Sequence, residues 1–257
     1  MTPAAPAWPE IDWRQPAFAP CGDHGRRALA CLREGAAVHQ ALRQAAGASP
    51  APRFVPQAAL PAGEPYESFI HRTGAVPTRD NLHDLFNGLV WLACPQAKRR
   101  LNELQATEIV RRGVGPTRGP LRDALTLFDE NGAVLDAPLP LWQALLARDW
   151  RRLFAEGRAL WRQARLMVFG HALLEQLATL PRKGLTAHVL CAPAGAAAIA
   201  PEDGAIAQAL QPAHLAAKPF APLPVLGVPG WCAANEAPVF YDDPAVFRPA
   251  RRPPPAR

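Results

Sequence analysis

The most informative stretch of the sequence is residues 71–105, HRTGAVPTRDNLHDLFNGLVWLACPQAKRRLNELQ. Its first half is crowded with side chains that bind metals or move protons, and an apolar segment follows at once. Pro77 breaks the chain and Thr78 is suited to cap a helix, so Asp80 falls in the first turn, where a carboxylate suits the helix dipole. Pro95 ends this helix and opens the next one. Two consecutive helices are therefore predicted here.

Two pairs of polar side chains share faces of the first predicted helix. Asp80 and Asp84 are four residues apart, and so are His83 and Asn87. Because a helix turns once in 3.6 residues, each pair lies on one face and the two faces adjoin. Such a group suits a metal site or acid–base catalysis. The competing interpretation is structural, with Asp80 compensating the helix dipole, Asn81 in the first turn and His83 as a hydrogen-bonded core residue.

A second group of candidate ligands lies nearer the C-terminus. The segment GHALLE places His171 and Glu175 on one helical face, and LTAH brings His188 in after a turn. If this helix packs against the helix that carries His83, the three histidines and Glu175 converge. Three nitrogen ligands and a carboxylate suit zinc, manganese or iron. The alternative is that His171 is a buried packing residue.

The whole chain is predicted to be mainly α, in the α+β class, with extended proline-rich segments wrapping a helical body. Its 30 prolines gather near both ends and in two internal segments, where extended structure is expected. The predicted organisation is a proline-rich N-terminal arm (1–22), a single globular domain (23–247) and a basic proline-rich tail (248–257). Further helices are predicted at residues 23–46, 66–72, 141–164, 167–180 and 202–217, and a strand at 185–192.

One small β-hairpin is predicted at residues 122–135, RDALTLFDENGAVL. Residues suited to strands stand on both sides of Asn131-Gly132, the commonest sequence for a tight hairpin turn. Asp129 and Glu130 also resemble part of a calcium-binding loop. Because the other calcium ligands are missing, the turn is the better explanation.

The positive charge suggests a different class of function. The net charge is +6 at pH 7, and the arginines concentrate in two predicted helices, 98–112 and 148–165, and in the tail. A solvated helix face is the ordinary explanation for such residues. The alternative to an enzyme is a non-catalytic binding protein that uses these arginines, Arg148 and Arg151 among them, on an acidic partner such as RNA or another protein.

Cysteine usage and hydropathy bear on the compartment. The five cysteines are scattered and form no CxxC motif, which is typical of reduced thiols in a cytoplasmic protein. The first residues have neither the basic nor the apolar region of a signal peptide. The longest apolar run, residues 189–200, is too short to span a bilayer. We therefore expect a cytoplasmic protein without a membrane partner.

Several segments together resemble a known family. The chain is similar to an uncharacterised bacterial family, domain of unknown function 3025, over most of residues 65–249. The resemblance implies a shared order of segments, but it implies no activity, cofactor or catalytic residue. The segments that carry it are VPTRDNLHDLFNGLVWLACP, RGPLRDALTLFDENGA, RDWRRLF, VFGHALLEQL with LTAH, and LGVPGW with FYDDPAVFRP.

The leading functional hypothesis from the sequence is a cytosolic enzyme with a metal-assisted, hydrolytic site and a small-molecule substrate. The cofactor would be a divalent transition metal. No phosphate-binding glycine loop and no GxSxG motif offers another kind of chemistry. The predicted metal ligands are His83, His171 and His188, the catalytic residues Asp80, Asp84 and Glu175, and the binding residues His71, Asn81, Asn87, Arg148 and Arg151.

Overall fold

The structure, a computed structural model, describes residues 8–47, 52–113, 119–193 and 198–249, which are mostly helical. Its α-helices are α1 (Gly22–Arg33), α2 (Val38–Ala46), α3 (Tyr66–Thr73), α4 (Leu82–Ala93), α5 (Pro95–Arg112), α6 (Pro120–Asn131), α7 (Leu139–Ala147), α8 (His171–Thr179), α9 (Asp203–Ala209) and α10 (Pro212–Ala216). Its strands are β1 (Arg53–Pro56), β2 (Ala75–Thr78), β3 (Gly132–Asp136), β4 (Arg165–Val168), β5 (Thr186–Leu190) and β6 (Phe220–Pro224).

The larger sheet is mixed and has the strand order β4-β3-β5-β6. Strand β3 pairs with β4 in antiparallel fashion and with β5 in parallel, and β5 pairs with β6 in antiparallel fashion. A second sheet contains only the parallel pair β1 and β2. The α+β class predicted from the sequence is thus confirmed, with more strand structure than expected.

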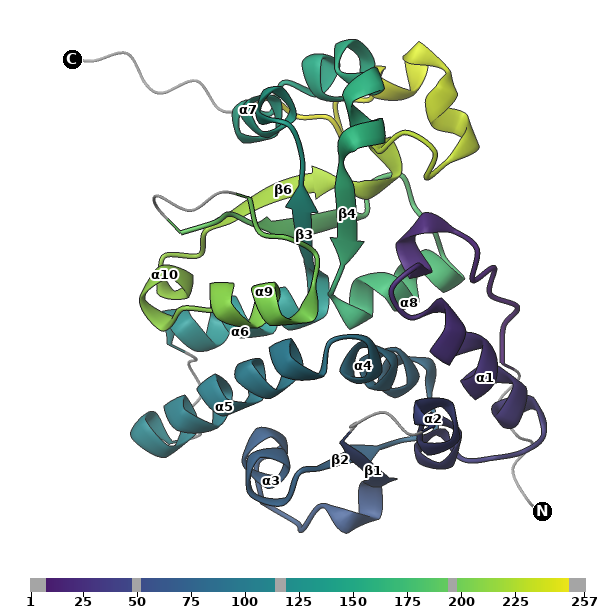
Figure 1. Ribbon diagram of the computed structural model, residues 1–257, viewed down its shortest axis with the longest axis vertical. Helices are drawn as coiled ribbons and strands as arrows, with labels where there is room; N and C mark the ends of the chain where they lie inside the picture. The colour runs from purple at the N-terminus through teal and green to yellow at the C-terminus, as the bar shows by residue number, and fades with distance from the viewer. Residues whose placement is uncertain (1–7, 48–51, 114–118, 194–197, 250–257) are drawn as a thin grey trace.

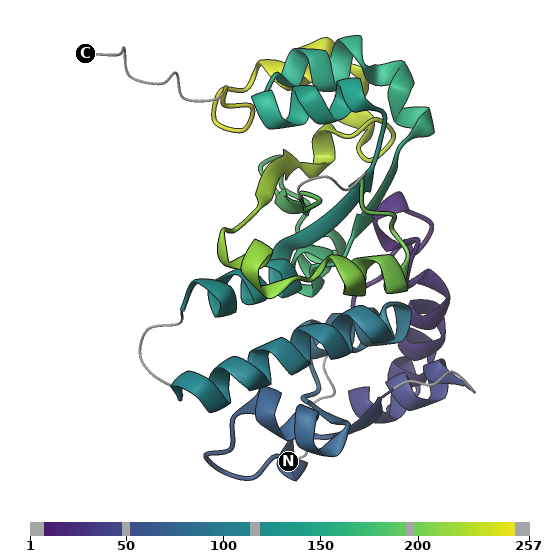
Figure 2. The same ribbon diagram turned by 60° about the vertical axis from the view of Figure 1, so that its left-hand side comes forward.

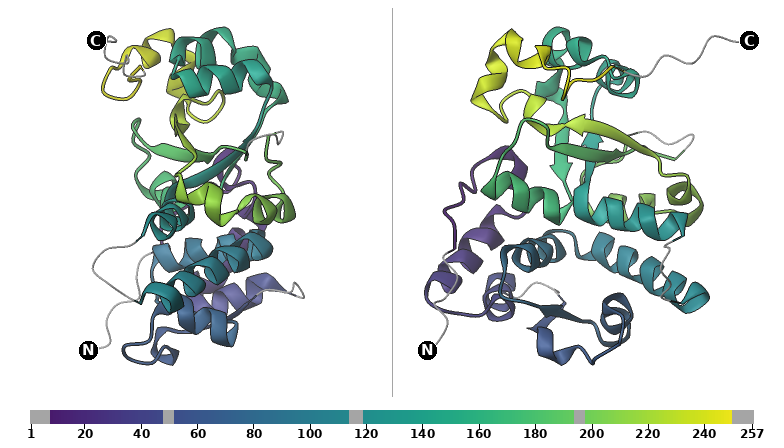
Figure 3. Two further views of the ribbon diagram at one scale, coloured as in Figure 1. Left: turned by 90° about the vertical axis from the view of Figure 1, so that its left-hand side faces the viewer. Right: turned by 180° about the vertical axis from the view of Figure 1, so that it is seen from behind.

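The elements are arranged in layers (Figure 1). Helices α6 and α8 lie between the four-stranded sheet and the pair α4 and α5. Helix α3 and the two-stranded sheet lie on the far side of α4 and α5, and α7 lies at the opposite end of the molecule. Figures 2 and 3 show the same order of layers from other directions. Consequently α4 faces both α6 and α8, two helices that are distant from it in sequence.

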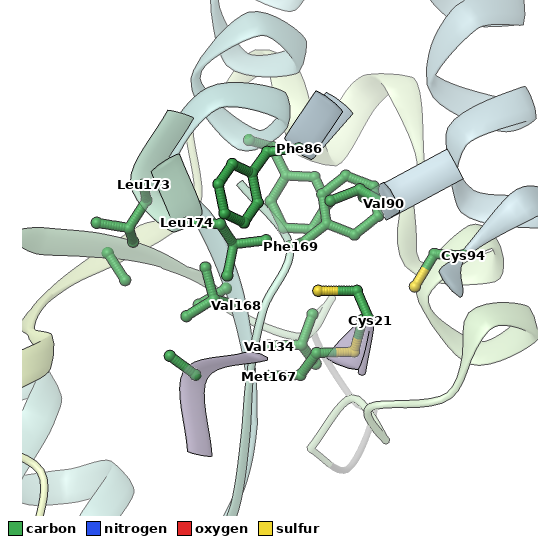
Figure 4. Packing of buried hydrophobic residues seen from close by; sticks show 14 of the residues in the cluster. Cys21, Phe86, Val90, Cys94, Val134, Met167, Val168, Phe169, Leu173 and Leu174 are labelled. Atoms are coloured by element: carbon green, nitrogen blue, oxygen red, sulfur yellow. The ribbon is translucent and has the colours of Figure 1, made fainter. Parts of the chain in front are cut away.

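Apolar side chains pack between α4 and α8 (Figure 4). Phe86 and Val90 of α4 are buried in one cluster with Leu173 and Leu174 of α8 and with Phe169, which precedes α8. Phe86 and Val90 are four residues apart, so they share one helical face. Full burial of a side chain of this size contributes about 1.5–3 kcal/mol. This packing fixes the first turn of α4 beside the start of α8.

The N-terminal segment packs on the same cluster. The ring of Trp13 lies 5.6 Å from the ring of Phe18 and 6.0 Å from that of Phe86, measured between centroids. Trp13 also lies directly over Gly25 of α1, where an added Cβ would come within 2.3 Å of the indole. Trp13 and Phe18, which precede α1, are therefore part of the core.

The predicted hairpin at residues 122–135 is wrong. Residues 120–131 form α6, and only the residues from Gly132 onward are a strand, which pairs with the distant β4 and β5. The reason is visible in the apolar spacing: Leu121, Leu125 and Phe128 recur at helical intervals and face the core. Asn131-Gly132 marks the end of a helix instead of a turn.

The start of α4 also differs from the prediction. Thr78 belongs to β2, and the helix is capped by Asn81, whose Oδ1 accepts a hydrogen bond from the backbone N–H of Asp84 at 2.8 Å. Asp80 therefore precedes the helix, and its carboxylate accepts a hydrogen bond from the N–H of Val38 at 2.8 Å. The predicted boundary at Pro95 is confirmed, since α4 ends at Ala93 and α5 begins at Pro95.

Other predicted helices are shorter than expected. The segment 23–46 divides into α1 and α2 at Gly35, whose φ of 93° breaks the helix. In the segment 141–164, α7 ends at Ala147, Arg148 follows it in the left-handed conformation, and short helical turns come next. Met167 and Val168 belong to β4, so α8 begins only at His171. The segment 202–217 divides into α9 and α10. The predicted helix at 66–72 and the strand at 185–192 are confirmed as α3 and β5.

Of the helices in the described residues, none combines the length and the apolarity that crossing a membrane requires.

Gly170 provides a test of the close approach between α6 and α8. A Cβ at this position would lie 2.5 Å from the backbone of both Glu130 and Asn131, so Gly170→Ala must displace one helix from the other. We expect a loss of about 1–3 kcal/mol in the free energy of unfolding, measured by urea denaturation. The matched control is Gly184→Ala, because a Cβ there meets only Val246 at 3.8 Å. Equal stability of the two variants would contradict this account.

Candidate metal centre

Three helices meet at a cavity of about 350 Å³. Helix α4 contributes His83 from its first turn, α6 contributes Glu130 from its last turn, and α8 contributes His171 as its first residue. One nitrogen from each imidazole and one oxygen from the carboxylate lie within 4.8 Å of one another. Among the described residues, no other His, Cys, Asp and Glu side chains form such a group.

The two histidines face each other through the same ring atom. Nε2 of His83 lies 3.1 Å from Nε2 of His171, and the rings meet edge-on with their centroids 4.6 Å apart. An imidazole nitrogen is either a donor or an acceptor. Two such nitrogens at this distance can share a proton or bind a common metal ion. His83 is partly exposed, whereas His171 is buried.

A carboxylate fixes the orientation of His83. Nδ1 of His83 donates to Oε2 of Glu175, with a separation of 3.0 Å. Since an ionised carboxylate only accepts, the proton belongs to Nδ1. Glu175 lies one turn after His171 on α8, so this helix supplies both the second histidine and the carboxylate that holds the first. The Nε2 of His83 therefore faces His171 and the cavity.

Glu130 adds an oxygen to the two nitrogens. Its Oε2 lies 3.6 Å from Nε2 of His171. Burial raises the pKa of Glu130, and the neighbouring charge of Asp129 raises it further. A nearby cation would favour the ionised form of this carboxyl and offset both effects.

His171 is in the form that binds metals. Burial lowers its pKa to about 4, and the attraction of Asp129 opposes this effect without overcoming it. The ring is therefore neutral at pH 7, and a neutral imidazole is the metal-binding form. Its Nδ1 is buried and has no hydrogen-bond partner among the described residues, although Oδ2 of Asp129 lies 3.9 Å away.

A buried lysine stands behind Asp129. Nζ of Lys98 contacts Oδ1 of Asp129 and donates to Oδ1 of Asn87 at 2.8 Å, and Lys98 is only 4% exposed. Burial alone would raise the pKa of Asp129, but the charge of Lys98 and the hydrogen bond that Lys98 donates oppose it, and the pKa is lowered. Asp129 is thus an ionised group held within the protein. Nδ2 of Asn87 in turn donates to the hydroxyl of Tyr66 at 3.1 Å.

The remaining wall of the cavity carries two more carboxyl groups. Glu67 accepts a hydrogen bond of 2.6 Å from Nδ2 of Asn102, and its pKa is raised by burial and then by Asp129. Asp84 is held by Arg79, whose Nε and Nη2 and backbone N–H all donate to it. Asp84 is buried and Arg79 is 60% exposed, so this ion pair reaches from the cavity to the surface.

Some residues predicted from the sequence lie elsewhere. His188 is on β5, half-buried beside Phe220, and does not belong to the group of converging ligands. Asp80 is bound to the backbone of Val38 and does not line this cavity. His71 lines a separate cavity of about 670 Å³, between α3 and α5.

The predicted binding residues have mainly structural partners. Asn81 caps α4 and Asn87 bonds to Lys98 and Tyr66. Arg148 ends α7. Most arginines of the two predicted basic helices also pair with carboxylates, which reduces the free positive charge available to an acidic partner. These pairs are Arg100–Glu103, Arg111–Glu108, Arg112–Glu108, Arg151–Glu156, Arg158–Glu236 and Arg165 with Asp136 and Glu202. The tail beyond Pro249 lies outside the described residues.

Several important residues were missed from the sequence. Asp129 and Glu130 were assigned to a turn, although the helical spacing of Leu121, Leu125 and Phe128 gives a signal that places them on the last turn of a helix. Lys98 was counted with the solvated arginines of α5. No local signal marks it as buried, because its partners come from α4 and α6.

The chain belongs to the family described as Protein of unknown function (DUF3025), whose model matches residues 52–251. The resemblance found in the sequence is therefore confirmed, and the match includes every residue of the candidate centre. No curated protein and no solved structure matches the chain. Its function has to be argued from the site itself.

The buried His171 predicts a loss of stability in mild acid. Its pKa is about 4 in the folded protein and about 6.5 when unfolded, so between these values the unfolded chain binds a proton that the folded chain does not. The contribution of the neutral His171 to the free energy of unfolding is present above pH 6.5 and is lost as pH falls toward 4. The loss approaches about 3 kcal/mol. Urea denaturation of chelator-treated protein at pH 8, 6 and 4.5 measures it.

The comparison variant for this prediction is His171→Gln, which has no titrating group at the position. We expect the wild type to lose more stability than the variant between pH 8 and 4.5. Between pH 9 and 8 the two should change in parallel, because His171 is neutral in both states there. Parallel curves across the whole range would contradict the prediction.

Proposed function

We propose that this protein is a metal-dependent hydrolase that holds one divalent transition metal ion with His83, His171 and Glu130. The observation that carries the proposal is the pair of Nε2 atoms facing each other at 3.1 Å at the wall of a cavity, with a carboxylate beside them. Glu130 takes the place that the sequence alone gave to His188. Zinc, manganese and iron all accept two imidazoles and a carboxylate.

The separations between the ligand atoms support this assignment. With metal–nitrogen distances of about 2.0–2.1 Å, two nitrogens on one ion lie about 3.0 Å apart at a right angle and about 3.4 Å apart in tetrahedral geometry. The observed 3.1 Å falls within this interval. The 3.6 Å between Oε2 of Glu130 and Nε2 of His171 is slightly longer than the tetrahedral separation.

The surroundings of the two histidines support it as well. Histidines that bind metals usually donate their other ring N–H to a carboxylate or a carbonyl, which fixes the tautomer. Glu175 has this position behind His83 at 3.0 Å, and Asp129 lies behind His171 at 3.9 Å. Each imidazole thus has a carboxylate on its Nδ1 side and directs Nε2 toward the other.

Three protein ligands would leave a coordination position open, as is typical of catalytic rather than structural sites. A metal ion bound there would supply Lewis-acid polarisation and an activated water nucleophile near neutral pH. The cavity of about 350 Å³ is at the small end of ligand sites, which favours a small-molecule substrate.

Glu67 is the carboxyl group best suited to exchange a proton with the substrate. It lines the cavity, its pKa is raised by burial, and Asn102 is its only side-chain hydrogen-bond partner among the described residues. A raised pKa brings a carboxyl closer to the working range of a general acid or base. The other carboxyl groups are engaged: Asp84 with Arg79, Asp129 with Lys98, Glu175 with His83 and Glu130 with the proposed ion.

Elemental analysis tests the metal site directly. Plasma mass spectrometry of tag-free protein should find one transition-metal ion per chain in the wild type and almost none in His83→Ala, His171→Ala and Glu130→Gln. The matched control is His188→Ala, which removes a half-buried histidine outside the group and should keep the metal. Circular dichroism confirms that each variant is folded. A metal-free wild type after reconstitution with zinc, manganese and iron would refute the proposal.

The role of Glu67 predicts a separation of metal binding from catalysis. Glu67→Gln preserves the hydrogen bond with Asn102 but removes the titrating carboxyl, so hydrolysis of a panel of chromogenic esters and anilides should fall by about 10²- to 10⁴-fold. Metal content should not change, since Glu67 is not one of the three ligands. Glu103→Gln, an exposed glutamate on α5, is the control. Full activity of Glu67→Gln would assign proton transfer to another group.

A further inference from the structure

Lys98 determines which group donates and which accepts in the hydrogen bonds that link it to Asn87 and Asn87 to Tyr66. An ammonium group has three donors and no acceptor, so every atom bonded to Nζ has to accept. Its two partners are a carboxylate oxygen of Asp129 and Oδ1 of Asn87. The opposite orientation of the Asn87 amide would place an NH₂ group against the ammonium. The amide orientation of Asn87 is therefore determined.

This orientation determines the next bond. With Oδ1 facing Lys98, Asn87 directs its NH₂ group toward Tyr66, and Nδ2 lies 3.1 Å from the phenolic oxygen. Tyr66 is thus the acceptor in this bond, and its own proton has to point elsewhere. Among the described residues, the hydroxyl of Tyr66 has no hydrogen-bond partner other than Asn87. The side chain lines the same cavity as His83 and His171.

We propose that the Tyr66 hydroxyl donates a hydrogen bond to the substrate's carbonyl oxygen and stabilises the negative charge that develops on it. This inference rests on the proposed hydrolase function, and it adds a substrate-binding group and a substrate class. The substrates would be carboxylic esters or amides, whose carbonyl oxygen becomes an oxyanion when water attacks. Because Lys98 donates to Asn87 and Asn87 donates to Tyr66, the proton of the Tyr66 hydroxyl remains available for the substrate.

The charges around the cavity support this substrate class. Burial raises the pKa of Tyr66 well above 10, and the charges of Glu67 and Asp84 raise it further, so the hydroxyl keeps its proton at neutral pH and acts as a donor. Carboxyl groups of Glu67, Asp84 and Asp129 also line the wall and disfavour a dianionic phosphate ester. Arg79 is already bound to Asp84 by two side-chain nitrogens.

The first test uses a probe that carries the oxyanion. Acetohydroxamate binds to metal ions through two oxygens, and its affinity for the cobalt-loaded protein can be followed by the visible spectrum of the ion. We expect Tyr66→Phe to weaken this affinity by about 10- to 100-fold, because a hydrogen bond to a charged oxygen is lost. Metal content should be unchanged. The control is Tyr241→Phe, whose hydroxyl bonds to backbone carbonyls away from this cavity.

A second variant tests the direction of the bonds. Asn87→Asp has nearly the same shape, still accepts from Lys98, but cannot donate, so the Tyr66 hydroxyl would donate to it and be lost to the probe. The added charge also repels the probe, and a double-mutant cycle separates the two effects. We expect Asn87→Asp to weaken binding by about 10-fold more in the wild-type background than in the Tyr66→Phe background. An equal effect in both backgrounds, or full affinity in Tyr66→Phe, would overturn the inference.

Failure of this inference can be told apart from failure of the proposed function. If the wild type binds no metal, the hydrolase proposal fails, and neutron diffraction from metal-free crystals then decides the direction of the Tyr66 bond. A deuteron on the phenolic oxygen that points into the cavity supports the assigned direction of this hydrogen bond, on which the inference depends. A deuteron that points toward Asn87 overturns it.

Discussion

The packing of α4 on α8 is the constraint on which the candidate centre depends. His83 and His171 are 88 residues apart in the chain, and their Nε2 atoms meet only because Phe86 of α4 is buried with Leu173 and Leu174 of α8. Trp13 and Phe18 cover Phe86 from another direction, so the N-terminal segment contributes to the same contact. Because Gly170 has no side chain, the end of α6 can approach the start of α8 until their backbones are in contact. Because apolar packing at this density resists small shifts, it can hold polar atoms at fixed separations.

The buried charge of Lys98 has a different role. Removal of an ammonium group from water costs several kcal/mol even when it is paired, and an apolar residue in its place is often as stable. Its presence here has an effect that an apolar residue would not have. It keeps Asp129 ionised behind His171, and through Asn87 it sets the donor and acceptor at Tyr66. A single cation between α4 and α6 therefore orders polar groups on two sides of the cavity.

The sequence predicted the position of most helices, the helix boundary at Pro95 and the class of the fold, because apolar spacing and proline are local signals, but it missed α6 and made several helices too long. It also selected His83, His171 and Glu175 as members of one group, although it offered no evidence that they meet. The assignment of residues 122–135 failed because Asn131-Gly132 was given more weight than the helical spacing of Leu121, Leu125 and Phe128. That single error concealed Glu130 and Asp129, since a turn would have exposed both. Lys98 could not have been recognised, because its burial depends on how α4, α5 and α6 pack.

The polar groups of the centre are difficult to explain as contributions to stability alone. A buried polar atom without a partner costs about 1–3 kcal/mol, and Nδ1 of His171 is such an atom. On the other side of the ring, Nε2 of His171 donates to Nε2 of His83, whose own proton is on Nδ1, and a carboxyl whose pKa is raised by burial lies beside this contact. A cation bound at the Nε2 atoms would place the His171 proton on Nδ1, where it faces Asp129, and would favour the ionised form of Glu130. The same residues that weaken the metal-free fold are therefore the ones a metal ion would stabilise, as expected where selection has acted on function at a cost in stability.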